Sequence, residues 1–308
     1  MRRDICYTII HYPRHRICLS APMRIKIMEL LYEGGDRNLN DLANKLGLTN
    51  SAVSLHVKAL ESAGLIEVHS APGKRGSMKI CKPLHESLLI NMAPVNEIVD
   101  YHYEDEIAIG YYSNCEIHPT CGIATPKDII GKFDDPRYFQ FADRFNAGVF
   151  WFGYGYVEYT LPNHLTKDQK AEQITLSFEI SSEFPCINED FPSDIEFYFN
   201  NTYIGTWLSP GDFGNRPGLI TPSWWVPSCN QYGLLKTLSI NHYGTYIDSG
   251  EKISSVTIDD FNLTCDDILT FRFQVSKNAK NCGGFTLFGR EFGDYDQGII
   301  FKTFYGKR

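Results

Sequence analysis

The first 132 residues contain no phenylalanine and no tryptophan, whereas the rest of the chain contains all 20 Phe and all 4 Trp. No apolar run approaches the ~18–20 residues that a membrane-spanning helix needs. The apolar stretch ICYTII near the basic N-terminus is too short for a signal-peptide core, and no small-residue cleavage site follows it. These absences predict a cytoplasmic protein without membrane spans, whose two parts have different cores.

A disulfide framework and the common catalytic motifs are also missing. The 9 Cys are odd in number and spread over the chain, so we expect free thiols in a reducing compartment. No Gly-rich phosphate loop, G-x-S-x-G elbow or HExxH motif occurs. The sequence therefore predicts no cofactor and no enzymatic activity.

Charge divides the chain in the same way as the aromatic residues. Residues 1–90 hold 13 Lys+Arg and 8 Asp+Glu, a net charge of +5, while residues 91–308 hold 16 and 29, a net charge of −13. Such asymmetry within an acidic chain points to a nucleic-acid partner for the basic part. We predict two domains, 1–90 and 91–308.

Three helical patterns and a hairpin follow one another in the basic part. Ser20 is expected to cap the first helix, and Gly34-Gly35 to end it. Asn38, with an acidic residue three positions on, caps the second, and Thr49 caps the third. The segments LIEVHS and SMKICKP, joined by the turn APGKRG, then predict a two-stranded wing.

The third helix has two different faces. Val53, Val57 and Leu60 recur at helical spacing and should pack inward. The opposite stripe is short and mostly polar, as an element that approaches base edges needs to be, and wing cations can meet phosphates. His56 flanks the buried face and suits helix packing as well as a phosphate contact. The residues predicted to contact double-stranded DNA are Asn50, Ser51, Ser54, Leu55, His56, Lys58, Lys74 and Arg75.

Residues 17–83 resemble the winged helix-turn-helix of ArsR-type bacterial repressors. DLANKLGLTNSAVSLHVKALESAGLI follows that family's pattern through Asp41, Leu42, Leu46, Thr49, Val53, Ser54, His56, Leu60, Gly64 and Leu65. The resemblance implies a homodimeric, sequence-specific transcription regulator, a repressor, with residues 49–62 as the recognition helix. The alternative is that the three helices serve only dimerisation or protein docking.

The chain departs from this family at two places. Metal-sensing members carry a Cys pair where Asn38 and Asn40 stand, so no thiophilic metal is expected here. Leu55 occupies a position that is often Arg or Gln, and it can touch a thymine methyl but cannot make a bidentate contact to guanine.

The acidic part alternates apolar and polar residues with period two, most clearly over 174–181, 195–200 and 269–276. This pattern, repeated between Gly, Pro and Asn, predicts an all-β antiparallel sandwich, jelly-roll-like in form. Further strands are expected at 148–160, 202–208, 234–248, 253–258, 284–289 and 298–304. DIEFYFNNTYIGTW, with a turn at Asn200-Asn201, resembles the hairpin of galactose-binding-like jelly rolls.

A long Gly/Pro-rich connection follows Trp207, and loops of this length are usually functional or disordered. Its aromatic faces and planar donors suit a sugar or another small polar ligand. The alternative is that the aromatic rings plug the end of the sandwich; of Trp224 and Trp225, one should point inward and the other outward. The candidate ligand residues are Trp207, Asp212, Asn215, Arg216, Trp224 and Trp225.

Two weaker groupings raise the question of a metal. Cys115, His118 and Cys121 lack a fourth ligand at a usual spacing, so structural thiols are favoured over zinc. Asp294 and Asp296 lie two apart in a loop, but the rest of a calcium motif is missing. No metal is therefore expected.

An alternative function for the acidic part is that of a carbohydrate-binding or glycan-acting module. In that case carboxylates such as Glu158, Glu179 and Glu196 would supply an acid/base pair.

Overall fold

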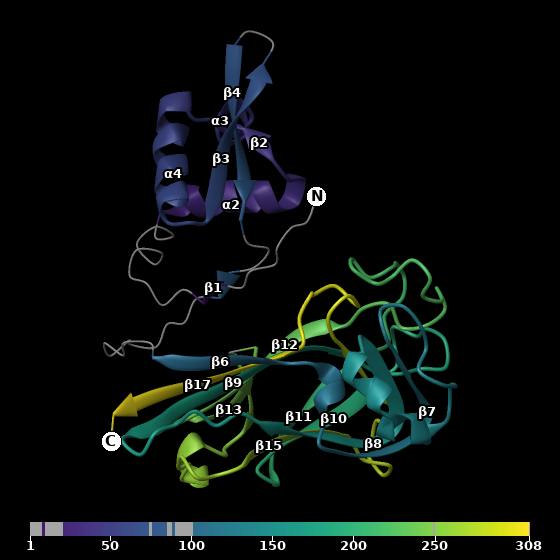
Figure 1. Cartoon of the computed structure of the whole chain (residues 1–308). Helices are drawn as coiled ribbons and strands as arrows, with labels where there is room; N and C mark the ends of the chain where they lie inside the picture. The colour runs from purple at the N-terminus through teal and green to yellow at the C-terminus, as the bar shows by residue number, and fades with distance from the viewer. Residues whose placement is uncertain are drawn as a thin grey trace. The chain divides into compact units, whose positions relative to one another are not determined.

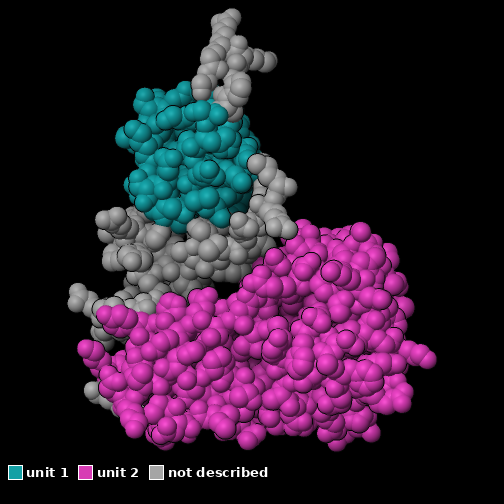
Figure 2. Space-filling view, viewed as in Figure 1, with its two compact units in different colours: residues 1–97 teal, residues 98–308 magenta. Residues whose placement is uncertain are grey.

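The computed structural model describes residues 8–9, 21–73, 76–84, 88–89, 101–248 and 250–307. The chain divides into two compact units, Met1–Glu97 and Ile98–Arg308 (Figures 1 and 2). The first combines helices with a small sheet and the second is built of antiparallel strands, which is the predicted fold class. Within the described ranges, no helix is both long and apolar enough to cross a membrane.

The N-terminal unit packs three helices on a three-stranded sheet of order β2-β4-β3 (Figure 1). Its elements are α2 (Pro22–Gly34), β2 (Arg37–Asn38), α3 (Leu39–Leu46), α4 (Asn50–Ser62), β3 (Ile66–Gly73) and β4 (Gly76–Pro83). The short strands β1 (Thr8–Ile9) and β5 (Leu88–Leu89) form a separate parallel pair. The core is a single cluster from all three helices and the sheet: Ile27, Met28, Leu31, Leu42, Ala43, Val53, Val57, Leu60, Ala63, Leu65, Ile66 and Cys81.

Two of the three predicted helix caps are confirmed. The side chain of Asn38 accepts the N–H of Asp41 at 2.9 Å, and that of Thr49 accepts the N–H of Ala52 at 3.3 Å. The predicted cap at Ser20 is wrong, because Ala21 holds that position without a side-chain hydrogen bond. Proline follows at the first helical position, where its fixed φ suits the start of a helix. The predicted end of this helix is confirmed at Gly34.

The wing is longer than the sequence predicts. The expected turn over 71–76 is mostly strand, since β3 continues to Gly73 and pairs there with Gly76 at the start of β4. Pro72 is tolerated in β3 because this strand lies at the edge of the sheet, where a missing N–H costs no ladder bond on the open side. Lys74 and Arg75, the predicted wing contacts, lie outside the described residues.

All strand pairs of the C-terminal unit are antiparallel. The main order is β11-β10-β15-β8-β16-β9-β12-β13-β14, with β7 added to β8, β17 to β9, and β6 to β17. The strands are β6 (His102–Ile107), β7 (Asn114–Ala124), β8 (Val149–Leu161), β9 (Gln169–Ser181), β10 (Ser193–Phe199), β11 (Thr202–Ser209), β12 (Leu234–Asn241), β13 (Gly244–Ile247), β14 (Glu251–Ser254), β15 (Leu269–Val275), β16 (Phe285–Phe288) and β17 (Ile299–Lys307). The single strand expected over 234–248 is thus the hairpin of β12 and β13.

The sheet curls on itself into a sandwich that is nearly a barrel. Its two end strands, β11 and β14, lie against each other, and a Cβ on Gly205 would stand 2.6 Å from the side chain of Ile253. The interior is filled by the alternating apolar residues that the period-two pattern predicts. Its centre is a group of mutually packed rings: Phe178, Phe197, Phe271, Phe273 and Phe285.

The predicted hairpin at Asn200-Asn201 is confirmed. Phe199 pairs with Thr202, and the two Asn have φ values of 45° and 62°. Two positive φ angles are what a two-residue type I′ turn requires, and Asn tolerates them. The resemblance of the whole unit to galactose-binding jelly rolls stays a prediction.

Candidate functional site

Helix α4 buries one face and exposes the other, as predicted. Val53 and Leu60 are 0% exposed and Val57 is 3% exposed, whereas Leu55 on the opposite side is 72% exposed. An apolar side chain that is held so far out of the core is available to a partner. A helix presented in this way has the dimensions that fit a DNA major groove.

The remaining predicted contacts surround this exposed face. Asn50, Ser51 and Lys58 are exposed, and Ser54 and His56 are half-buried. All five residues belong to α4, and the Thr49 cap fixes where this helix starts. The helix therefore presents short polar side chains, a leucine and one cation to its surroundings.

The two asparagines that replace the Cys pair have structural roles. Asn38 caps α3, and Asn40 Oδ1 accepts a hydrogen bond of 2.7 Å from Asn50 Nδ2, which links α3 to α4. Their amides offer no thiolate to a soft metal. This part of the unit is used to hold α4 in place.

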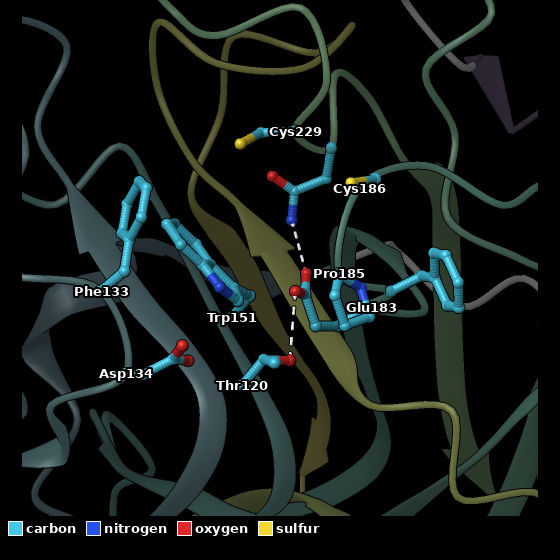
Figure 3. A pocket seen from close by; sticks show the side chains of 10 residues that line it. Thr120, Phe133, Asp134, Trp151, Glu183, Pro185, Cys186 and Cys229 are labelled. Atoms are coloured by element: carbon cyan, nitrogen blue, oxygen red, sulfur yellow. Dashed lines mark hydrogen bonds between the residues drawn. The ribbon is translucent and has the colours of Figure 1, made fainter.

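A second feature is a cavity of about 140 Å³ inside the β unit (Figure 3). Figure 3 shows Phe133 and Trp151 on one side of the view and Pro185 and Cys186 on the other. The lining comes from β7 and the segment after it, from β8, from the segment after β9 and from the long connection before β12: Thr120, Phe133, Asp134, Trp151, Glu183, Phe184, Pro185, Cys186, Cys229 and Asn230. Strands distant in sequence thus build one site.

Glu183 is the central polar group of this cavity and is 7% exposed. Its carboxylate accepts hydrogen bonds from Asn230 Nδ2 at 3.0 Å and from the hydroxyls of Thr120 and Thr286, each at 3.4 Å. Burial raises the pKa of Glu183 well above its usual range, and the charge of Asp212 raises it further. Ionisation of this side chain is therefore costly at its buried position.

Two buried acceptor atoms beside Glu183 have no hydrogen-bond partner among the described residues: Asn230 Oδ1 and Asp212 Oδ1. Asn230 is 3% exposed and Asp212 is 0% exposed. Burial raises the pKa of Asp212 to about 7, although its other oxygen accepts the N–H of Phe184 at 3.2 Å. Buried polar atoms without partners are rare in folded proteins, so each needs an explanation.

Comparison with known proteins bears on the N-terminal unit. The model of the bacterial regulatory protein, arsR family, matches residues 21–68, from the start of α2 into β3. Residues 21–68 are therefore similar to the helix-turn-helix of this family. No curated protein matches the chain.

The solved structures that are similar to the chain at a low level include one much longer protein. It is dimeric latent PorU from Porphyromonas gingivalis, with a TM-score of 0.28 and 12% identity over 75% of this chain. The chain covers 16% of that structure's length. A likeness this weak carries no argument about function, and the β unit is understood from its own geometry.

The two tryptophans in the long connection before β12 are placed as predicted. Trp225 is 3% exposed, packs on Trp151 and donates to the backbone oxygen of Asn230 at 2.9 Å. Trp224 is 37% exposed and donates to the oxygen of Pro126 at 2.7 Å. One ring therefore points inward and the other outward, and the buried ring positions a residue of the cavity.

The other candidate ligand residues do not gather at one open site. Arg216 binds Asp294 through two hydrogen bonds of 2.9 and 2.6 Å and lies over the ring of Tyr232. Asn215 accepts the hydroxyl of the same tyrosine at 2.8 Å. Trp207 is 8% exposed in β11 and offers no open platform. Only Asp212 lies next to the cavity, where it acts on Glu183.

Neither metal candidate fits the geometry. Cys115 points toward the interior of the sheet while His118 lies on the other face, stacked on Tyr154 with ring centroids 4.2 Å apart. Burial raises the pKa of the Cys121 thiol to about 12, which disfavours a thiolate ligand. No group of three potential ligands able to hold a metal occurs in the described part of the chain.

The acidic pair in the last loop is engaged as well. Both oxygens of Asp294 are taken by Arg216, and Asp296 accepts the N–H of Glu291 at 3.1 Å. A neutralised carboxylate is a poor calcium ligand, so the loop is better described as held by an ion pair.

The sequence reading missed Glu183, Asn230 and Thr120. Glu183 lies two residues after the strand predicted over 174–181, and Asn230 lies in the connection already singled out for its length. A carboxylate near the end of a predicted strand, together with an unusually long loop, could have indicated this site. The spacing of the three residues in the sequence does not indicate that they lie close together.

Proposed function

We propose that the chain is a sequence-specific DNA-binding transcription regulator that acts as a homodimeric repressor. The observation that carries this proposal is the coincidence of the arsR-type match with the two-faced helix α4. The helix that the resemblance implies for DNA recognition, residues 49–62, is the one whose outer side is free of core contacts. Localisation in the cytoplasm belongs to the same proposal.

In this function two copies of α4 enter successive major grooves and the wings grip the flanking backbone, so the pair reads a near-palindromic site. Ser51 and Ser54 supply hydroxyls to base edges, and Leu55 meets a thymine methyl. Phosphates repel the net −13 of residues 91–308, so we expect the contacts to DNA to be confined to the basic unit. Phosphate contacts supply most of the affinity, so binding weakens steeply with salt.

The test is a genome-fragment binding selection with the full chain at two salt concentrations. A Ser54→Glu/Lys58→Glu variant places two negative charges on the outer face of α4. Lys26→Glu is the matched control, because Lys26 is an exposed lysine on α2. We expect a palindromic site to be enriched by the wild type and the control and lost in the double variant.

Absence of enrichment even at low salt would contradict the proposal. In that case the alternative, a helix-turn-helix used for dimerisation or docking, would account for the arsR-type match.

We further propose that the β unit is an effector or assembly unit and not an enzyme. The carboxylates that sequence offers for glycan hydrolysis each have structural partners. Glu158 binds Arg272 at 2.7 Å, Glu196 accepts from Gln274 at 2.9 Å, and Glu179 accepts three backbone N–H groups. Release of reducing sugar from a glycan panel, abolished by one carboxylate change, would contradict this.

A further inference from the structure

We propose that the cavity around Glu183 binds a small organic cation, a protonated primary amine with a short apolar body. The cavity lies wholly within the β unit, so this inference does not depend on DNA binding by α4.

The first argument is charge without a counter-ion. The negative charges of Asp212 and Asp134 act on Glu183, and none of the ion pairs among the described residues involves Glu183 or Asp212. A buried carboxylate is normally paired with a cation or neutralised by a proton. A cationic ligand would supply the missing partner.

The second argument is the unpartnered amide oxygen of Asn230, a residue that lines the cavity. Asn230 Nδ2 is held by Glu183 at 3.0 Å and by Thr286 at 2.8 Å, which fixes the orientation of the amide and leaves Oδ1 as a free acceptor. Glu183 and Asn230 both line the cavity, so their acceptor oxygens lie beside one space. An ammonium group has three donors and no acceptor, and therefore matches them.

The walls select an organic cation over a bare metal ion. Phe133 and Trp151 line the cavity with their rings 5.4 Å apart, and Phe184 adds a third ring. Aromatic faces attract ammonium groups and cover apolar chains, whereas Ca²⁺ needs six or more oxygens. No metal-holding group of His, Cys, Asp and Glu is found among the residues described.

The size of the space limits the ligand. A cavity of about 150 Å³ accommodates benzene, so one of about 140 Å³ suits a body of about six heavy atoms. At the rim, Cys186 has a φ of 131°, a strained conformation of the kind that is retained at ligand clamps. Benzylamine and n-butylamine are suitable probes, and benzyl alcohol and n-butanol are their uncharged counterparts.

The experiment is isothermal titration calorimetry of the full chain at pH 8 without DNA. Each amine is expected to bind roughly 10- to 100-fold more tightly than its alcohol, because a charge-assisted contact replaces a neutral one. Glu183→Gln should remove this preference, whereas Glu251→Gln, an exposed acid on β14, should retain it.

A second variant keeps the proposal testable if Glu183→Gln does not fold. Phe133 is 45% exposed, so Phe133→Ala should leave thermal unfolding unchanged while weakening the binding of benzylamine severalfold. Amine affinity should also fall as the pH is lowered from 8 to 5. Equal binding of amine and alcohol, no binding of either, or an unchanged preference in a folded Glu183→Gln would overturn the proposal. None of these results bears on whether α4 binds DNA.

Discussion

Asp212 gives the β unit a stability that depends on pH. The residue is fully buried, and its pKa is raised by burial from 3.8 to about 7. A carboxyl whose folded pKa lies above its unfolded pKa prefers the protonated, folded state. Its contribution is therefore complete below about pH 4 and is lost as the pH rises through 7.

The size of the effect follows from the same two values. A pKa that moves from 3.8 to about 7 corresponds to about 4 kcal/mol between the acidic and the alkaline limits. Whole domains are stable by only ~5–15 kcal/mol, so this is a large share. Asp212→Asn keeps an oxygen for the N–H of Phe184 and cannot ionise. We expect it to be about as stable as the wild type at pH 4 and more stable at pH 8, by up to about 4 kcal/mol.

Tryptophan fluorescence is the assay, because all 4 Trp lie between residues 151 and 225 and report the β unit alone. Urea unfolding at pH 4, 6 and 8 is compared for the wild type, Asp212→Asn and the exposed-acid control Glu251→Gln. Burial also raises the pKa of Glu183, so the variant should flatten the pH dependence without removing it. A variant with the same slope against pH as the wild type would refute the reasoning.

Three further predictions test the packing and the electrostatics. Gly155→Ala should destabilise the β unit by about 3 kcal/mol or more, because the new Cβ would lie 1.9 Å from a backbone oxygen at a φ of +124°. Gly250→Ala is the control: its Cβ would lie 3.9 Å from the nearest atom, so the free energy of unfolding in urea should change by less than about 0.5 kcal/mol. In α4, Val57→Ala should cost about 2 kcal/mol in circular-dichroism melts, whereas Leu55→Ala should leave the melt unchanged and weaken only DNA binding. Two carboxylates, Asp259 and Glu172, raise the pKa of His242. The stability that this histidine contributes should therefore be present below about pH 6.5 and vanish as the pH rises through the pKa of the folded state. An NMR titration of the ring measures that pKa, and an unshifted value would contradict the pairing.

Most of the N-terminal unit could be predicted from the sequence, because the patterns that determine it lie close together along the chain. The Asn38 and Thr49 caps lie within three residues of the groups they bind, and the Val53 stripe repeats at helical spacing. The failures are equally local. Ala21 takes the cap position expected for Ser20 because Pro22 already begins the helix, and edge placement lets β3 run through a proline.

The β unit shows where such reasoning ends. Alternation locates its strands and the Asn200-Asn201 turn, but the order of the strands is set by contacts across the sheet. β16, for example, pairs with both β8 and β9, although more than 100 residues separate it from either. The loop tryptophans were rightly split into one buried and one exposed ring, since alternation along an extended segment is again a local property.

The cavity could not be found from the sequence for a physical reason. Thr120, Asp134, Trp151, Glu183 and Asn230 come from five places in the chain, and each is ordinary in its own sequence context. What marks them is a balance of charges and hydrogen bonds that exists only after folding, namely a carboxylate without a cation and an amide oxygen without a donor.

Whether the two units communicate can be tested without knowing how they are arranged. If an amine in the cavity changes the affinity for DNA by some factor, then DNA must change the affinity for the amine by the same factor. A coupled regulator is expected to show a factor of roughly 5 to 150. Benzylamine titrations are run with and without the selected DNA site, and DNA titrations with and without benzylamine, with benzyl alcohol as the control. Equal factors that differ from one, in either direction, establish effector control of DNA binding. Affinities that are identical in all four titrations would mean that the β unit does not regulate α4 through this cavity, even where each site binds its own ligand.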